Sequence, residues 1–524
     1  MKNKKQILIM MAIFLIMQTI IYIYVGANKS YIHIDEAYSY GLSQYGRTEI
    51  QDNEDFYNNW HTKEYYEDYL AVQEEESGNY KQVYENQKND VHPPLYYLIL
   101  RIAMNFTKGH FSKWTGIVLN IIIYAFITIF MYLILKEIFK EEENVEIKSS
   151  ILAFVSSIIL ASISNVIYIR MYALATLNIV ITTFLHIKLL ESKEIKPKLL
   201  ICIGISVLAG ILTHYFYLFY LVGLYLIFLI KYIKEKRIKE LLYYTLTMII
   251  AGIISLIIFP YSIKHMFFGY RGQGVISNFK NIKEIIPAIF GQIYNLNYYG
   301  FNNLLPLILV IIIGILIYNK IKKKESIKIA EQEKDILKLI AIPSTIFFVV
   351  SSIASPWRVL RYIVPVCSLI FVVVIYYFYK LLQNAFGEKT SNILISIMLC
   401  MILIAPFALK MEPELLYSDR KDTMQKLTGE LNLPAIYLYN SQNGGFLNDI
   451  LVFSSINESY IAKDIEVEDV QKIFKDRDTS KGIIVFINEE KEDNETIDKT
   501  KKILNFANCE HLQRLTSCDA YYIY

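Results

Sequence analysis

The stretch Tyr31–Tyr40, Tyr-Ile-His-Ile-Asp-Glu-Ala-Tyr-Ser-Tyr, places two adjacent carboxylates directly after the first hydrophobic run. Asp35 and Glu36 would point about 100° apart on a helix, so at most one of them can face a given cavity. That one could act as a general base toward a hydroxyl group. Alternatively, both are solvated, or they cap a helix that begins near Ala37.

A second marked stretch, Asp90-Val-His-Pro-Pro-Leu-Tyr-Tyr97, follows about fifty-five residues later. Four histidines fall on the same predicted side of the protein: His33, His92, His214 and His265. Neither a CxxC pair nor a His-x-x-x-His pair is present. We therefore expect no cofactor, while a divalent metal stays open. We place His33, His92 and His214 around the substrate, with His92 orienting its loop through hydrogen bonds.

Four arginines fall at the predicted outer ends of hydrophobic runs: Arg170, Arg271, Arg358 and Arg361. The guanidinium group matches phosphate oxygens and stays charged. Arginine is unusual on the outer side of a membrane protein, which favours phosphate binding at these positions. The alternative is that each side chain extends to the lipid headgroups. Tyr172 and Tyr362 accompany Arg170 and Arg361 in the sequence and are expected at the same site.

These residues need a membrane scaffold, and the composition supplies one. The chain has 524 residues, of which 54% are hydrophobic and 20% charged, against about a quarter charged in soluble proteins. A net charge of +3 and the absence of a basic stripe exclude nucleic acid as a partner. The first apolar run is nearer the length of a membrane span than of a signal peptide.

Eleven hydrophobic runs are long enough to predict membrane spans. They lie near 6–26, 115–136, 150–169, 172–189, 199–214, 216–231, 241–260, 303–319, 338–355, 362–380 and 392–409. Lysine-rich connections alternate with them and predict a cytoplasmic amino terminus and an extracytoplasmic tail. The sequence thus predicts a multi-pass α-helical protein of the cell membrane, surrounded by lipid.

The membrane domain is expected over 1–410, with a long first outer loop at 27–113. Within this loop, Tyr96–Met104 predicts an interfacial helix that begins after Pro93-Pro94. The acidic stretch from Glu49 to Asp90 is a solvated face or, alternatively, a selector for a cationic acceptor. A second outer segment, Tyr261–Phe301, contains Tyr270–Gly274, which we interpret as a flexible loop over the substrate or a plain connector.

The tail, 411–524, is more polar and predicts a small α/β extracytoplasmic domain with a largely parallel sheet. Strands are expected at Ala435–Tyr439, Gly482–Ile487 and Ala520–Tyr524, and helices at Val467–Arg477 and Thr496–Ala507. No catalytic constellation is visible there. Cys509 and Cys518 could form a disulfide if a turn brings them together.

The Asp-Glu pair after the first span, followed by His-Pro-Pro-Leu-Tyr-Tyr before the second, resembles the protein O-mannosyltransferase and aminoarabinose-transferase group. Arg170-x-Tyr172 and Arg361-Tyr362 followed by Pro365 are similar to further stretches of these proteins. The resemblance covers about 1–410 and implies a glycosyltransferase C-type fold. It also implies that Asp35, the first acidic residue, carries catalysis, and that the helices of the first outer loop pack beside the active site.

The chain departs from protein O-mannosyltransferases at Leu95-Tyr96-Tyr97, where those have Leu or Phe followed by Gly-Lys. Its tail shows no β-trefoil signature. The departures leave both the sugar and the acceptor open. The predicted function is transfer of a sugar from a polyprenyl-phosphate donor to a glycan, lipid or protein, with Asp35 and Glu36 as the catalytic pair. The alternatives are a secondary transporter or lipid flippase, and a sensor or assembly protein whose tail binds a ligand.

Overall fold

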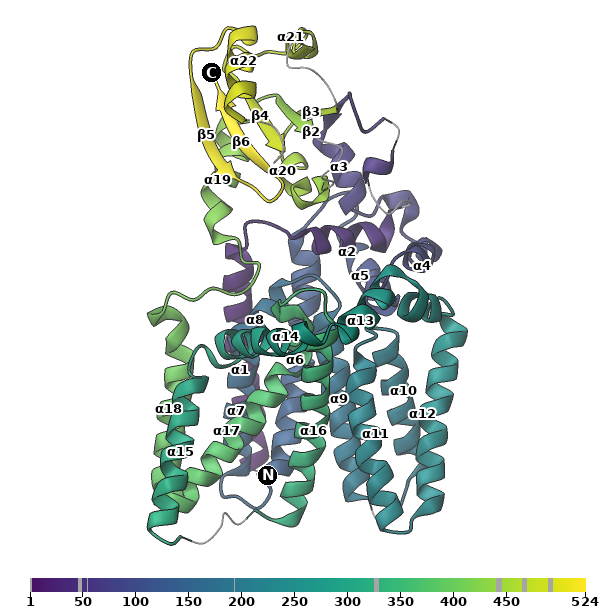
Figure 1. The fold of residues 1–524 in the computed structure, drawn as a ribbon, viewed down its shortest axis with the longest axis vertical. Coiled ribbons are helices and arrows are strands. Elements are labelled where there is room, and N and C mark those ends of the chain that lie inside the picture. The colour runs from purple at the N-terminus through teal and green to yellow at the C-terminus, as the bar shows by residue number, and fades with distance from the viewer. Residues whose placement is uncertain are drawn as a thin grey trace. The chain divides into compact units, whose positions relative to one another are not determined.

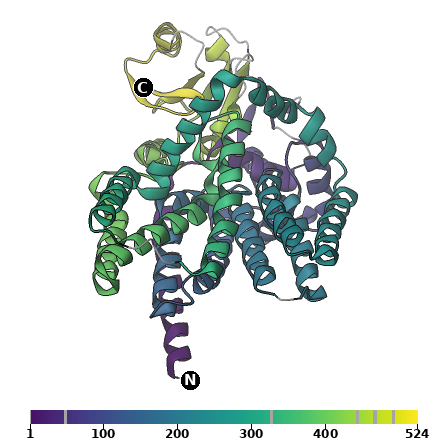
Figure 2. The same cartoon turned by 60° about the horizontal axis from the view of Figure 1, so that its bottom comes forward.

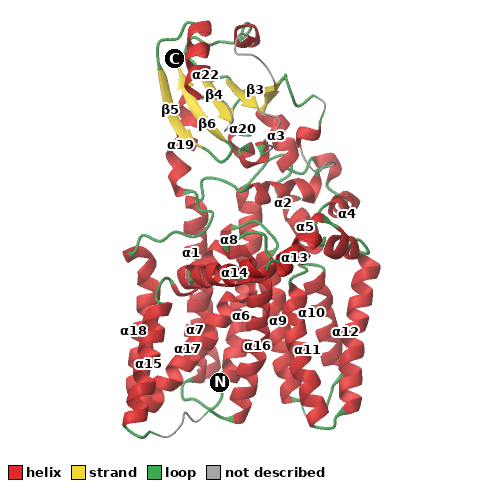
Figure 3. Cartoon of the chain, in the orientation of Figure 1, coloured by secondary structure: helices red, strands yellow, loops and turns green. Residues whose placement is uncertain are grey.

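The computed structural model describes residues 2–45, 50–53, 55–192, 194–324, 329–439, 445–463, 469–488 and 493–524. The chain forms two compact units. We call 1–25, 91–96 and 118–414 the helical unit, and 26–90, 97–117 and 415–524 the mixed unit. Within the described residues all strands belong to the mixed unit, as Figure 3 shows in yellow.

Eight helices are long and apolar enough to cross a membrane within the described part of the chain. Because a span needs about 20 mostly apolar residues, these helices define a multi-pass membrane protein (Figure 1). They are α1 (Lys2–Asn28), α6 (Lys113–Ile138), α9 (Tyr172–Glu191), α11 (Tyr217–Lys234), α12 (Ile238–Ile258), α16 (Glu331–Ala354), α17 (Val364–Phe386) and α18 (Glu388–Ala408).

Two bent helix pairs raise the number of candidate spans to as many as ten over the same described ranges. The first pair is α7 (Val145–Ile158) with α8 (Leu160–Ile167), bent by 56°. The second joins 282–300, which begins with α14 (Ile282–Asn295), to α15 (Leu305–Ile321), bent by 93°. All eleven runs predicted from the sequence are helical, but the run near 199–214 is the 15-residue α10 (Pro197–Ile211), shorter than a usual span.

The helices of the helical unit differ in how deeply they are buried. Helix α17 is 78% buried over its apolar window, whereas α1 and α12 are each 17% buried. The exposed apolar sides of α1 and α12 suit contact with lipid tails. Figure 2 shows the amino terminus at the tip of the purple α1. In Figure 1, α13 (Tyr270–Lys280) and α14 lie across the long helices near their ends.

Helices α11 and α16 approach each other closely. A Cβ atom at Gly223 would lie 2.6 Å from the Pro343 Cα atom. Small residues at such a crossing allow helix backbones to approach each other in a membrane, where the hydrophobic effect does not drive helices together. Gly223 is therefore required by this packing.

The mixed unit gathers the short helices of the first loop and the tail. The loop contains α2 (Ile34–Gln44), α3 (Lys63–Leu70), α4 (Tyr80–Asn89) and most of α5 (Leu95–Met104). The helix predicted after Pro93-Pro94 is thus present as α5. The tail contains α19 (Lys421–Gln425), α20 (Ile450–Phe453), α21 (Val470–Ile473) and α22 (Asp493–Leu504).

A six-stranded sheet of order β1-β3-β2-β4-β6-β5 joins the loop to the tail. Its strands are β1 (Trp60–Thr62), β2 (Ala435–Tyr439), β3 (Glu458–Lys463), β4 (Ile483–Asn488), β5 (Cys509–Arg514) and β6 (Cys518–Ile523). Edge strand β1 comes from the first loop and pairs antiparallel with β3, with Trp60 opposite Tyr460. A strand from the first loop was not predicted.

The sheet is parallel only at its centre, where β2 pairs with β3 and β4. The prediction of a largely parallel sheet was therefore wrong for the other three pairings, which are antiparallel. The fully buried β2 and β4 supply its core, with Val470, Phe474 and Ile497 packed against them. The start of the helix predicted at Val467–Arg477 lies outside the described residues. Within the described residues of that range, the helical part is α21, Val470–Ile473.

Two further predictions are corrected. Tyr270–Gly274 is the start of helix α13 rather than a loop. Cys509 and Cys518 are both free, because the β5–β6 hairpin places Cys509 opposite Ile523 while Cys518 lies at the other end of β6.

Candidate active site

Helix α2 presents the Asp-Glu pair in its first turn. His33 is the N-cap residue, and its Nδ1 atom accepts a hydrogen bond from the Asp35 backbone N–H at 3.1 Å. Glu36 accepts reciprocally from the His33 backbone N–H at 2.7 Å. This capping box satisfies amide groups that have no partner within the helix. Glu36 thus takes part in the cap, as one interpretation of the sequence expected, but the N-cap residue is His33 and the helix begins at Ile34 rather than near Ala37.

Glu36 is fully buried and forms an ion pair with Lys29, 2.9 Å between Nζ and Oε2. Lys29 is also fully buried, and desolvation lowers its pKa although the charge of Glu36 opposes the shift. Lys29 donates a further hydrogen bond to the Leu415 carbonyl oxygen at 2.9 Å. Glu36 therefore fixes the start of α2 and is shielded from solvent.

Asp35 has different surroundings. Its side chain is 23% exposed and lies 3.5 Å from His33 Nδ1. Negative charge is favoured at a helix amino terminus, so Asp35 can stay ionised there. Of the two adjacent carboxylates, Asp35 is the one that solvent or substrate can reach.

The beginning of α6 is tied to α2. The Tyr40 hydroxyl donates to the Ser112 carbonyl oxygen at 2.9 Å and accepts from the Gly116 backbone N–H at 3.2 Å. Lys113 donates to the Lys29 carbonyl oxygen. Lys29 and Lys113 were not predicted, because single lysines in a lysine-rich chain give no pattern. The one available signal was the position of Lys29, seven residues before Glu36.

A second group of predicted residues meets in the helical unit. Arg170 donates to His92 Nδ1 at 3.4 Å and is only 4% exposed. The His214 ring lies 6.3 Å from the His92 ring and 5.3 Å from the Tyr172 ring. Four residues from three distant parts of the sequence are thus adjacent.

A backbone hydrogen bond fixes the tautomer of His214. Its Nδ1 atom accepts a hydrogen bond from the Phe216 backbone N–H at 3.0 Å, so the proton of the neutral ring resides on Nε2. Burial, together with the nearby His92 and Arg170, lowers the pKa of His214 to about 3. The ring is therefore a neutral hydrogen-bond donor at physiological pH.

Arg361 continues this group. It donates to the Tyr168 hydroxyl at 3.0 Å, and Tyr168 stacks on Tyr172. The Tyr362 ring meets the Tyr172 ring edge-on at 6.4 Å. The Trp357 ring, 48% exposed, has Arg271 at 4.7 Å and Arg361 at 5.4 Å, both cation–π distances.

Glu414 lies beside this group and was not predicted. Burial raises the pKa of its carboxyl, while Arg361 opposes the shift. The carboxylate accepts from the Leu360 backbone N–H at 3.4 Å. Glu414 gives Arg361 a nearby carboxylate in this structure.

Arg358 has a carboxylate partner of its own. It pairs with Glu284 on the surface, where the two side chains are 50% and 55% exposed. An exposed pair of this kind contributes little to stability. Arg271 and Arg361 thus share the Trp357 ring, and Arg170 lies beside His92, whereas Arg358 pairs with Glu284.

In the part of the chain that the structure describes, no three His, Cys, Asp or Glu side chains lie together in a way that could hold a metal ion. His265, the fourth predicted outer histidine, bonds instead to the Tyr215 hydroxyl at 3.0 Å.

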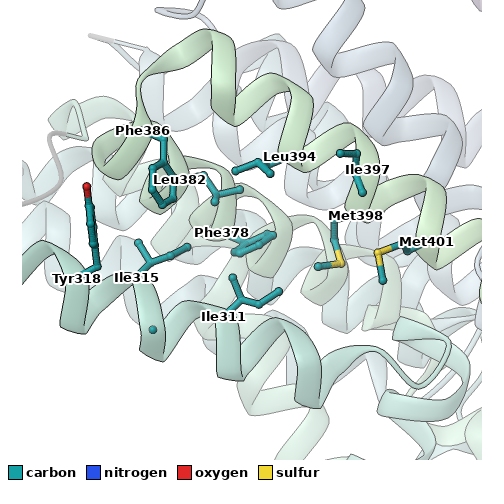
Figure 4. A pocket seen from close by; sticks show the side chains of 11 residues that line it. Ile311, Ile315, Tyr318, Phe378, Leu382, Phe386, Leu394, Ile397, Met398 and Met401 are labelled. Carbon is teal, nitrogen blue, oxygen red and sulfur yellow. The ribbon is translucent and has the colours of Figure 1, made fainter.

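An apolar groove of about 440 Å³ lies elsewhere in the helical unit, between α15, α17 and α18 (Figure 4). Its lining is almost wholly hydrocarbon and thioether, so it offers no group for acid–base chemistry. The lining residues are Ile311, Gly314, Ile315, Tyr318, Phe378, Leu382, Phe386, Leu394, Ile397, Met398 and Met401.

The fold and these residues define a multi-pass helical membrane protein with a mixed α/β unit and two clusters of polar side chains. No protein-family model matches the chain, and no curated protein matches it. Among solved structures, the chain is similar to ArnT from Cupriavidus metallidurans bound to undecaprenyl phosphate, with 8% identity and a TM-score of 0.45 over 98% of this chain and 97% of that one. The same ArnT in the apo state gives 8% identity and a TM-score of 0.46 over 100% and 98%.

Proposed function

We propose that this protein is a membrane glycosyltransferase that moves a sugar from a polyprenyl-phosphate donor to an acceptor hydroxyl. The observation that carries the proposal is the separation of the two carboxylates, with Asp35 accessible and Glu36 buried in an ion pair. One accessible carboxylate suits a reaction that needs one base. The order of the Asp35-Glu36 and His92-Pro-Pro motifs supports the same function.

The chemistry of the leaving group explains why one base suffices. Glycoside hydrolysis uses two carboxylates, one of which protonates the departing alcohol. A phosphate departs as a stable anion and needs cationic contacts instead. Arg170 and Arg361, with Arg271 beside the shared Trp357, supply guanidinium groups for this role. His214 would add a neutral N–H donor.

In the proposed step, the acceptor oxygen attacks the anomeric carbon and its proton passes to the Asp35 carboxylate. The bond from the anomeric carbon to the phosphate oxygen breaks, and both electrons leave with the phosphate. Attack from the face opposite the phosphate inverts the anomeric configuration. Asp35 belongs to the mixed unit, and the three arginines belong to the helical unit.

We further propose that transfer takes place on the extracytoplasmic face, with a cytoplasmic amino terminus and an extracytoplasmic mixed unit. The lysine-rich connections Lys2–Lys5, Lys188–Lys198 and Lys231–Lys239 support this orientation. A secondary transporter or flippase would instead place ionisable residues on a path through the spans. The accessible chemistry at α2 favours the transferase.

The test is turnover of purified protein with a panel of polyprenyl-phosphate sugars, followed by release of polyprenyl phosphate. General-base participation contributes about 10²–10⁴ in rate, so Asp35→Asn should lose at least about a hundredfold in kcat. Donor binding should persist, because the amide is nearly isosteric with the carboxylate and the arginines are unchanged.

Glu85→Gln is a matched control, since Glu85 is a half-exposed carboxylate of α4 that pairs with Lys88. It should retain wild-type turnover. Wild-type kcat in Asp35→Asn would refute the assigned base, and absence of polyprenyl phosphate release by the wild type across the panel would refute the donor class.

A further inference from the structure

The carboxylate of Asp449 is fully buried in the mixed unit and accepts hydrogen bonds from five donors. The backbone N–H groups of Thr516 and Ser517 donate at 3.1 and 3.0 Å. The Ser517 hydroxyl and the Cys518 thiol donate as well. A buried charge is costly unless it is fully hydrogen-bonded, and these donors meet that requirement.

The fifth donor comes from the other end of the sequence. The hydroxyl of Tyr31, 418 residues before Asp449, donates to Asp449 Oδ1. Tyr31 is fully buried, and burial together with the charge of Asp449 raises the pKa of its phenol. The phenol thus stays protonated and remains a donor at every physiological pH.

Tyr31 lies two residues before His33, the cap of α2, and four before Asp35. Neighbouring residues have parallel attachments to the tail. Ser30 donates to the Tyr417 carbonyl oxygen, and the Arg420 guanidinium lies 4.6 Å from the Tyr31 ring. The segment that leads into α2 is therefore fixed by contacts from the tail, although the sequence of the tail shows no catalytic constellation.

We propose that Asp449 is a positioning residue for the reaction, which orients the Asp35 carboxylate by holding Tyr31 and the cap of α2. This inference rests on the proposed function for its catalytic part. Its structural part, the attachment of the α2 cap to the tail, does not depend on what the protein catalyses. Burial of an aromatic ring alone would not require a charged partner for its hydroxyl, so the Tyr31–Asp449 bond is the contact to test.

Two readouts test the proposal in the full-length protein: amide hydrogen exchange over 29–40, and kcat and KM in the polyprenyl phosphate release assay. Tyr31→Phe removes one hydroxyl and Asp449→Asn removes the charge. Both should speed exchange over 29–40. Both should lower kcat about 10- to 100-fold, the effect of displacing a reacting group by about 1 Å, with KM within about twofold.

Epistasis separates positioning from general stability. In an Asp35→Asn background, Tyr31→Phe should cost no further kcat, because the group that it positions is gone. Asp519→Asn is the matched control, since Asp519 lies in the same sheet but pairs with Arg514 and His511. It should leave kcat and the exchange over 29–40 unchanged.

The proposal is overturned if Tyr31→Phe leaves exchange over 29–40 and kcat at wild-type values, or if its loss of kcat is equally large in the Asp35→Asn background. Tyr31→Phe keeps the aromatic ring, so it decides the matter even where Asp449→Asn fails to fold. A wild-type kcat in Asp35→Asn would refute the assigned base, and absence of polyprenyl phosphate release by the wild type would refute the proposed function. Faster exchange in Tyr31→Phe would still show the attachment of the cap in either case.

Discussion

At the scale of single residues, burial assigns different tasks to two neighbouring carboxylates. Glu36 and Lys29 are both withdrawn from solvent and neutralise each other. Removing one member of such a pair leaves an uncompensated charge in a region of low dielectric constant. Asp35 retains access to water, which a group that exchanges protons requires.

Glu36→Gln should therefore act on stability. We expect it to lower the free energy of unfolding by about 3–5 kcal/mol, because Lys29 is left buried without its counter-charge. The double variant Lys29→Met/Glu36→Gln should recover most of this loss, since the glutamine oxygen can still cap His33. Apparent melting temperatures in detergent measure both. Equal melting of Glu36→Gln and wild type would show that the ion pair contributes nothing.

His214 gives a pH dependence. Its pKa of about 3 in the folded protein lies below its ordinary value of 6.5, so between these values the unfolded chain binds the extra proton and the folded one does not. The contribution of His214 to the free energy of unfolding is therefore fully present above about pH 6.5 and is lost as the pH falls toward 3. Melting temperature measured from pH 7.5 to 4.5 should fall less steeply for His214→Gln than for wild type. Equal slopes would contradict a buried neutral His214.

The sequence supplied the members of the candidate site but not the contacts that distinguish one from another. Asp35, Arg170, Arg361 and their tyrosines follow from motifs and from arginines on an unusual side. The choice of Asp35 over Glu36 came from resemblance, since adjacent residues have the same local pattern. The partners that distinguish them, Lys29 and His33, are fixed only by the folded geometry of the α2 cap.

At the scale of elements, the crossing of α11 and α16 depends on one glycine. Gly223→Ala should lower stability by about 1–3 kcal/mol, because its Cβ atom would meet the Pro343 backbone and overpack the crossing. Gly252→Ala in α12 meets nothing within 4 Å and should stabilise by up to about 1 kcal/mol through helix propensity. Melting of the two variants in opposite directions is the expected result. A destabilisation of the same size in both would show that the crossing is not specific.

Elements with strong local signals were predicted well. The eleven apolar runs are helices, and β2 matches its predicted bounds. Strands β1, β3 and β5 were not predicted. Strand β1 has three residues and pairs with β3, about 400 residues away in the sequence, whereas β5 contains no buried residue that would give a strand pattern. Tyr270–Gly274 carries two glycines that suggest a loop, yet it forms the start of α13. Tertiary contacts override such weak propensities.

At the scale of the whole molecule, the orientation of the chain is open to a direct test. Reporter fusions after residues 320 and 410 should report opposite compartments, because three long apolar helices, α16, α17 and α18, separate these points. A fusion after residue 145 should agree with that after residue 320, on the cytoplasmic side. The same compartment for the fusions at 320 and 410 would refute the proposed topology.

The pairing of β1 with β3 also has a consequence for biosynthesis. Trp60 leaves the ribosome 400 residues before its partner Tyr460. At about 5–20 residues per second, the first loop waits on the order of 20–80 s for the strand that completes it. During that interval the edge of β1 and the hydroxyl of Tyr31 lack their final partners. Attachment of the α2 cap to the tail is therefore among the last events of synthesis, and a chain cut short before residue 449 contains all its candidate spans but lacks the partner of the Tyr31 hydroxyl.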